Sequence, residues 1–353
     1  MKPPLPQPKF KFKAGKARAA KKGTHRILIM PVFSDEPPAE IASSTGVSGL
    51  RKVLDLHRSQ GAFKAESQQS IHLAEHGVLL GGLGARDRFH PESVAALFRQ
   101  LGERTARYKE VSLEILISPA LAGAVADYSA AATAEPSAEI DFRASGARKP
   151  KSKAGKAGKA GASGEGPDYR SEYTVDDLIT QITACMQIGA TGTRVLKSEV
   201  ESPASSASKK KKAASKAAKN TPTETTVRGN ADAIKGPALS RAVDRGAILG
   251  DLVNRARYIA ALPGNFLNPE QYEVYARSLA KDYGLKIKVW NVPALEKMGC
   301  GGILAVGKGA AVPPRMIQVE YTPPRAKQVS GRPLVLVGKG ITFDTGGISI
   351  KPA

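Results

Sequence analysis

The sequence predicts an α/β protein: a smaller N-terminal α/β domain followed by the beginning of a second domain with a mainly parallel sheet. Short apolar runs of strand length alternate along the chain with longer segments whose apolar residues follow the helical period. A glycine-rich loop follows the last of these apolar runs. Strands that alternate with helices favour a parallel sheet with helices packed on it.

The first half of the chain contains three apolar runs that predict buried strands. Between the second and the third, Val94, Leu97 and Leu101 recur at the spacing of one helix face. A further apolar segment with helical period follows a low-complexity stretch. We therefore expect strands at 26–32, 77–83 and 111–117, and helices at 91–108 and 175–188.

The second half begins with two predicted helices separated by a Pro-Gly-Asn turn. The second of them starts at Pro269 and ends before Gly284, residues that favour a helix start and a helix end. The last run is apolar throughout, as expected for a strand buried on both faces. The predicted elements are helices at 242–261, 269–283 and 294–298, and strands at 285–290, 316–321 and 333–337.

The net charge of +21 is concentrated in three stretches without acidic residues. Residues 1–26, 148–159 and 209–219 hold 21 of the 53 Lys and Arg residues, which leaves 32 against 32 acidic residues elsewhere. Lysine-rich, low-complexity stretches cannot bury a core. We expect a basic disordered tail at 1–24, an N-terminal α/β domain at 25–200 with an insert at 148–166, a Lys/Ala/Ser-rich insert at 201–228, and the start of the second domain at 229–353.

Two cysteines, Cys185 and Cys300, without a CxxC spacing indicate a reducing compartment and no disulfide framework. No apolar run approaches the roughly 18–20 residues of a membrane span, so we expect no membrane partner. The acid-free N-terminus is similar in composition to an organelle transit peptide, but its early prolines oppose an amphipathic helix. A cytoplasmic protein is expected, and organelle import stays an alternative.

The glycine-rich loop after residues 333–337 carries Lys339, Asp344 and Lys351. Asp344 offers a hard carboxylate that can bind or bridge divalent metals. A lysine binds metal only when its amine is neutral, whereas a charged lysine can polarise a carbonyl group. From this spacing alone, a solvated loop with a capping aspartate is the simpler interpretation.

Residues 337–353 resemble the leucyl aminopeptidase (cytosol aminopeptidase) family nearly residue for residue. The similarity covers about 245–353 and includes the turn at 263–265 and the glycine-rich run at 299–309. It implies a metallo-aminopeptidase catalytic domain that releases N-terminal residues, often leucine, from peptides. It also implies two divalent metal ions, zinc or manganese, and a homo-hexamer in the complete protein.

By this resemblance Lys339 is a ligand of one metal, Asp344 bridges both, and Lys351 is the catalytic lysine that polarises the scissile carbonyl. The family's further metal carboxylates, and an arginine that holds a bicarbonate as general base, lie downstream of this motif. Because the sequence ends at Ala353, we expect a partial chain that is inactive by itself. Whether the stop is natural or a truncation stays open.

The remaining motifs have weaker functional interpretations. Lys209-Lys210-Lys211-Lys212 could bind nucleic acid through phosphates, but no aromatic residues interleave the lysine runs, so a solvated spacer is favoured. A noncatalytic basic adaptor is the rival hypothesis. The run at 302–309 nearly spells a P-loop, but Gly309 replaces the expected hydroxyl residue. His72 and His76 have a metal-compatible spacing, although packing is favoured.

Overall fold

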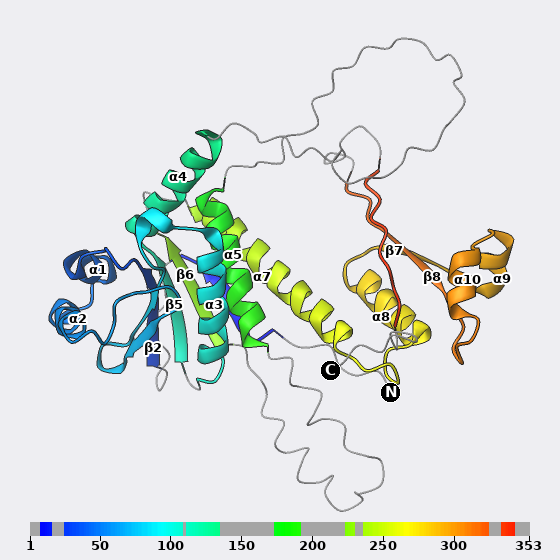
Figure 1. Ribbon diagram of the computed structural model, residues 1–353, viewed down its shortest axis with the longest axis horizontal. Coiled ribbons are helices and arrows are strands. Elements are labelled where there is room, and N and C mark those ends of the chain that lie inside the picture. The colour runs from blue at the N-terminus through cyan, green and yellow to red at the C-terminus, as the bar shows by residue number, and fades with distance from the viewer. Residues whose placement is uncertain are drawn as a thin grey trace, which may run out of the picture. The chain divides into compact units, whose positions relative to one another are not determined.

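The computed structural model describes residues 8–15, 25–108, 111–134, 173–191, 223–229, 236–324 and 333–342 (Figure 1). The chain divides into two compact units. The N-terminal unit comprises Gln7–Gly192 and Ser202–Asn254, and the body of the C-terminal unit is Arg255–Ala353.

A six-stranded sheet with the order β1-β6-β5-β2-β4-β3 forms the centre of the N-terminal unit. All neighbouring strands run parallel except β3, which pairs antiparallel with β4 at one edge. The mainly parallel sheet confirms the predicted α/β class. The strands are β1 Phe10–Ala14, β2 His25–Val32, β3 Ser70–Leu73, β4 Val78–Gly82, β5 Val111–Ile117 and β6 Thr223–Gly229.

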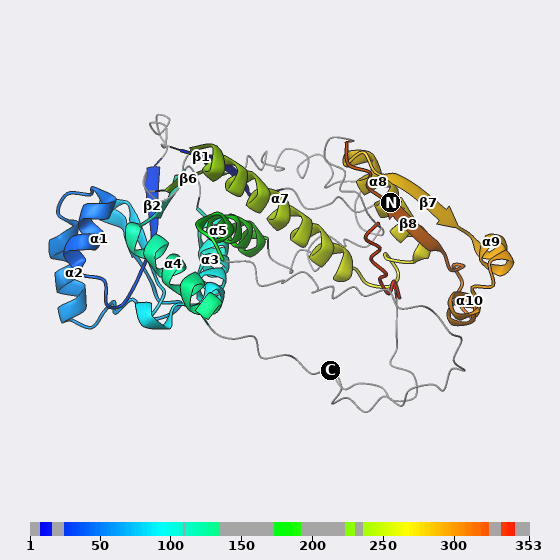
Figure 2. The same ribbon diagram turned by 90° about the horizontal axis from the view of Figure 1, so that it is seen from above.

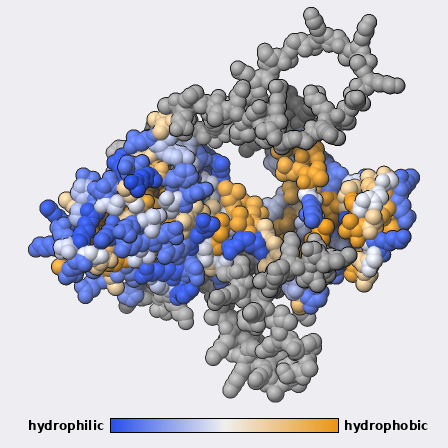
Figure 3. Space-filling model, viewed as in Figure 1, coloured by the Kyte–Doolittle hydropathy of each residue, from blue (hydrophilic) through white to orange (hydrophobic). Residues whose placement is uncertain are grey.

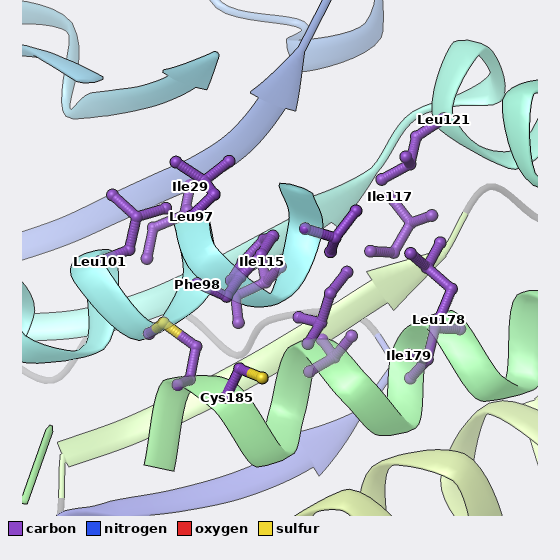
Figure 4. Close-up of a cluster of buried hydrophobic side chains, with 14 of the residues drawn as sticks. Ile29, Leu97, Phe98, Leu101, Ile115, Ile117, Leu121, Leu178, Ile179 and Cys185 are labelled. Carbon is purple, nitrogen blue, oxygen red and sulfur yellow. The ribbon is translucent and has the colours of Figure 1, made fainter. Parts of the chain in front are cut away.

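Successive residues of the central strands enter two different cores, because side chains alternate between the faces of a sheet. Ile29 and Ile115 belong to a core built with α3 and α5, which Figure 4 shows in close-up. Leu28 and Met30 belong to a second core that α1 and α2 complete. The helices of this unit are α1 Pro38–Thr45, α2 Leu50–Ser59, α3 Pro91–Thr105, α4 Pro119–Ala134, α5 Val175–Ala190 and α7 Gly236–Ala260, with 3-10 turns η1 Ala74–His76 and η2 Arg86–Arg88.

Two of these helices begin where the sequence predicts, and each has a side-chain cap. Thr174 Oγ1 accepts a hydrogen bond from the Asp177 backbone N–H, and the Asp177 carboxylate accepts one from the Thr174 N–H, both at 3.2 Å. At the start of α3, His90 Nδ1 accepts from the Glu92 N–H at 3.2 Å. Caps satisfy N–H groups that a helix start leaves without an intrahelical partner.

Close contact between helices α3 and α5 depends on glycine. A β-carbon at Gly102 would clash with the Met186 carbonyl oxygen, and one at Gly189 would clash with the Arg99 carbonyl oxygen. The two helices therefore approach backbone to backbone. Figure 2 shows α3 and α5 next to each other, as the residue contacts between them require.

Strands β1 and β6 correct two of the predictions. Phe10–Ala14 lies within the expected disordered tail 1–24, and Thr223–Gly229 overlaps the expected insert 201–228. Phe10 and Val227 are buried in the same core, whereas Lys13 and Glu224 form an exposed ion pair at 3.3 Å. In β1, Lys11 and Lys13 hid the alternation of apolar and polar residues. Residues 1–7 and 16–24 of the tail, the insert at 148–166 and residues 201–222 of the second insert lie outside the described residues.

Helix α7 also begins earlier than the predicted 242–261 and belongs with the N-terminal unit as far as Asn254. The sequence predicts instead that all of 229–353 belongs to the second domain. A β-carbon at Gly246 would clash with the Thr180 carbonyl oxygen, and Asn254 Nδ2 donates to the Gln187 carbonyl oxygen at 2.8 Å. These contacts pack α7 against α5, which explains why most of α7 belongs to the N-terminal unit and not to the second domain.

The C-terminal unit has a two-stranded antiparallel sheet, formed by β7 Lys286–Trp290 and β8 Met316–Glu320. Three buried residues, Leu262, Leu267 and Tyr275, make up its compact apolar cluster. The predicted helices and strands at 269–283, 285–290, 294–298 and 316–321 are confirmed to within a few residues. The helices are α8 Pro269–Asp282, α9 Val292–Lys297 and α10 Gly301–Gly307.

The predicted buried strand at 333–337 is wrong for this structure. These residues carry no strand hydrogen bonding, and the exposed fractions of Leu334 to Val337 range from 71% to 95%. A strand buried on both faces needs neighbouring strands and covering helices. Within the described part of the C-terminal unit, the sheet has only β7 and β8, and neither pairs with this segment.

A membrane span also requires a long apolar helix. Among the helices that the structure describes, none is both long and apolar enough to cross a bilayer.

Candidate metal centre

Of the three residues predicted to form the site, the structure describes Lys339 alone. It lies in an irregular extended stretch at 333–342, and its side chain is exposed. Asp344 and Lys351 lie outside the described residues. The structure therefore places one candidate ligand and does not test whether the three side chains meet.

The immediate surroundings of Lys339 are open. A β-carbon built on Gly338 or on Gly340 would meet no other atom within 4 Å. A lysine ligand works best in a dry, crowded centre, where neighbouring cations and burial favour the neutral amine. The described residues around Lys339 provide no such enclosure.

No alternative metal site appears in the described parts of the chain, where no group of three His, Cys, Asp or Glu side chains could hold an ion. His72 lies on strand β3 and His76 on the 3-10 turn η1, so the two imidazoles do not share a helix face. The His72 ring stacks on Tyr108 with centroids 5.7 Å apart. Packing, the favoured interpretation, explains His72 without a metal.

The cysteines and the P-loop-like run have structural explanations as well. Both cysteines are free thiols, and burial raises the pKa of the Cys185 thiol, which makes it a poor nucleophile. Gly301–Gly307 forms helix α10 soon after α9 ends at Lys297. A phosphate-binding loop instead joins a strand to a helix, so the run at 302–309 lacks the context that nucleotide binding needs.

Sequence reasoning missed an ion-pair network that ties together segments of the C-terminal unit. Arg315 reaches Glu273 at 3.1 Å and Glu270 at 3.7 Å, and Arg277 reaches Glu273 at 2.7 Å. Arg315 and Glu273 have side chains only 18% and 19% exposed, so this contact is screened less than a surface pair. Glu273 and Arg277 stand four residues apart on α8, a spacing that could have revealed that pair.

Comparison with known proteins decides what the C-terminal segment is. Residues 254–353 match the model described as "Cytosol aminopeptidase family, catalytic domain". Over this segment the chain is similar to the catalytic domain of that family. The resemblance read from residues 337–353 is therefore confirmed.

Curated relatives match the same third of the chain. A "Probable cytosol aminopeptidase" from Streptomyces coelicolor is 45% identical over 116 residues, which is 33% of this chain and 22% of the relative. Another of that name from Geobacter sp. is 49% identical over 100 residues, or 28% of this chain and 20% of the relative. The matched segment thus spans about a fifth of the length of these cytosol aminopeptidases.

Solved structures extend the similarity of fold to nearly the whole chain. A tomato leucine aminopeptidase mutant superposes with a TM-score of 0.62 at 16% identity, covering 96% of this chain and 55% of the other. The bottromycin maturation enzyme BotP in complex with Mn gives 0.53 at 20% identity, covering 93% and 50%. At such low identity the likeness shows the fold alone.

Proposed function

We propose that this protein is part of a metal-dependent aminopeptidase that releases N-terminal residues, preferably leucine, from peptides. The observation that carries the proposal is the Lys-Gly-Asp-Gly-Gly-Lys pattern at 339–351, within the segment that matches the family's catalytic domain. Peptides with a free N-terminus are the corresponding substrates.

Each of the three side chains has a distinct chemical role in the proposal. The Asp344 carboxylate has two oxygens, so it can hold two cations at once. The Lys339 amine donates its lone pair only after it has lost its proton. Lys351 keeps its charge and donates a hydrogen bond to the carbonyl oxygen of the scissile amide, where negative charge develops during attack.

The chemistry of this donor set fits a divalent ion, because amine nitrogen and carboxylate oxygen are ligands that zinc and manganese accept. When bound, such ions polarise a carbonyl group and lower the pKa of water. Lys339, the member of this set that the structure describes, has an exposed side chain. We propose zinc or manganese as the metals and bicarbonate as the general base in the complete enzyme.

Lys339 and Asp344 are too few ligands for a stable two-metal centre, since such ions need several protein donors each. We therefore propose that activity requires further ligands besides those two, and that the chain as given is inactive alone. A cytoplasmic location belongs to the same proposal and draws on the word cytosol in the names of the curated relatives. Homo-hexamer assembly is proposed on the family resemblance alone.

The proposal can be tested in a chimera. Residues 254–353 replace the matching segment of the Streptomyces coelicolor relative, which is 45% identical to this chain there. Hydrolysis of leucine amides that depends on added zinc or manganese is the expected result. A folded chimera with normal metal content and no hydrolysis would contradict the proposed function.

The rival hypothesis, a basic adaptor that binds nucleic acid, predicts a different result. The chain would be retained on DNA, and retention would fall steeply with salt because bound phosphates release counterions. Deleting 148–159 and 209–219 would abolish that retention. The aminopeptidase proposal requires neither stretch, because the chimera that tests it contains only residues 254–353 of this chain.

A further inference from the structure

A recess of about 450 Å³ lies on the N-terminal unit, between the last turn of α3 and the edge strand β3. It is separate from the candidate metal centre, which belongs to the C-terminal unit. Its volume falls within the range of small-molecule sites, roughly 300–1,000 Å³. The residues that line it are Ser70, Gln100, Glu103, Arg104, Arg107 and Tyr108.

Two guanidinium groups line the recess, and each has a partner, although the side chains of Arg107 and Glu103 are 73% and 65% exposed. Arg104 Nη1 donates to Ser70 Oγ at 3.0 Å, and Arg107 Nη2 pairs with the Glu103 carboxylate at 2.8 Å. Residues three apart at a helix end lie on the same side. Since a guanidinium has five N–H donors, one such bond leaves others free for a ligand.

An aromatic pair adjoins these cations. The His72 ring stacks on Tyr108 at 5.7 Å with an angle of 27° between the planes. Burial, and then the positive charge of Arg104, lower the pKa of the His72 imidazole. The neutral form of His72 is therefore favoured behind Tyr108, and it is the Tyr108 ring that lines the recess beside the two arginines.

We propose that this recess binds a phosphate monoester with a flat apolar body. Guanidinium groups bind phosphate oxygens through paired, charge-assisted hydrogen bonds. The Tyr108 ring provides a surface for the organic part, for which the recess has room beyond a phosphate ion. Glu103 opposes an anion, but its carboxylate is already paired with Arg107.

A purely structural role for the two arginines makes a competing prediction. Cations near a helix C-terminus stabilise the helix dipole, and Arg104 lies in the last turn of α3. In that case, replacing either arginine would lower the thermal midpoint, and phosphate compounds would neither bind nor shift that midpoint.

The experiment titrates the full chain with phenyl phosphate, inorganic phosphate and phenol, using calorimetry and the NMR signal of labelled His72. Phenyl phosphate is expected to bind more tightly than inorganic phosphate and to shift the His72 signal, while phenol binds weakly. Losing one charge-assisted contact in Arg104→Gln or Arg107→Gln should weaken binding about tenfold. The matched control is Arg99→Gln on the same helix, because Arg99 Nε donates to the Ala95 carbonyl oxygen and does not line the recess.

Three results would overturn the proposal: phenyl phosphate affinity unchanged in both recess variants, equal affinity for phenol, or an equal loss in Arg99→Gln. The two variants guard against a folding defect in one of them, since circular dichroism shows which one retains the fold. None of these results bears on the aminopeptidase proposal, because the chimera lacks the recess.

Discussion

The two units differ in the size of their apolar cores and in how similar their sequences are to known proteins. The N-terminal unit surrounds a six-stranded sheet with two apolar cores, whereas the compact cluster of the C-terminal unit has three buried residues. Yet the family match falls on 254–353, mostly in the thinly packed unit. Figure 3 shows apolar surface over that unit as well as polar surface.

This difference teaches that sequence likeness follows chemistry more closely than local stability does. A core tolerates many apolar combinations if volume and pattern are kept, so its sequence can drift. Ligands and glycine turns at a site permit far fewer replacements. The chain as a whole accordingly shares a fold with the tomato leucine aminopeptidase mutant at 16% identity, while a segment of 116 residues keeps 45% identity with a curated relative.

The largest expected effect is a loss of stability in the N-terminal unit alone, which can be measured because each unit gives its own spectroscopic signal. Phe98 is fully buried between sheet and helix, so Phe98→Ala should cost about 3–5 kcal/mol of unfolding free energy. Trp290, the single tryptophan, lies on β7 in the C-terminal unit. In Phe98→Ala, the urea midpoint measured by circular dichroism should therefore fall strongly. The midpoint measured by Trp290 fluorescence should stay unchanged.

The control for that experiment is Val337→Ala. Val337 is 95% exposed, so neither transition should move measurably. If Phe98→Ala moved both transitions together, the two units would unfold as one, and the comparison between them would fail.

A second effect tests the close packing of α3 on α5. In Gly189→Ala the new methyl group meets the Arg99 backbone carbonyl, which cannot move alone, so we expect a loss of about 1–3 kcal/mol or more. The matched control is Gly123→Ala on α4, where the new methyl group meets only the flexible end of the Arg86 side chain. Thermal denaturation of both variants should show a large drop for the first and little change for the second.

A third effect concerns a charged group inside the sheet of the N-terminal unit. The Glu114 side chain is 1% exposed and pairs with Arg26 and, at 2.9 Å, with Arg228. Glu114→Gln removes the charge and keeps the shape, so both arginines lose a negatively charged partner. Because those arginines are 47% and 33% exposed, water replaces part of the interaction, and we expect a loss of about 1–2 kcal/mol. Equal urea midpoints for the variant and the parent would show that the pairs contribute nothing.

The smallest effect is a dependence on pH. Burial raises the pKa of Glu36 above its usual value; the nearby Glu40 and Asp35 add to the rise, against the Phe33 N–H and Arg58. A raised pKa means that the folded state holds the proton more tightly, so this residue's contribution to stability falls as pH rises through that pKa. Glu36→Gln should therefore gain stability relative to the parent between pH 4 and pH 7. A constant difference across these pH values would exclude the effect.

The sequence predicted the central strands and the capped helices because strong periodicity and caps are local signals. Val94, Leu97 and Leu101 define the buried face of α3 without any knowledge of the partner. Strand β1 was missed because Lys11 and Lys13 dominate its composition, although Phe10 and Phe12 alternate with them. The opposite error occurred at Leu334 to Val337, which were predicted to be a buried strand and are exposed. An apolar run predicts burial only where neighbouring elements cover it.

For the candidate site, the sequence supplied residue types and an order, and the structure describes only Lys339. The predicted roles of Asp344 and Lys351 require their side chains to lie close to Lys339 in space. The spacing of these residues along the sequence does not specify that arrangement. The ion pairs of Arg315 with Glu273 and Glu270 illustrate this limit, because they join residues more than forty positions apart.

The most direct test of the central claim compares two variants of the chimera that contains residues 254–353, by metal analysis and by leucine-amide hydrolysis. Asp344→Ala is expected to lose both metals and all activity. Lys351→Ala should keep nearly full metal content while turnover falls by about a hundredfold or more, the cost of losing a carbonyl-polarising donor. Full metal occupancy in Asp344→Ala, or normal turnover in Lys351→Ala, would contradict the assignment of residues 339–351 to a two-metal peptide-cleaving centre.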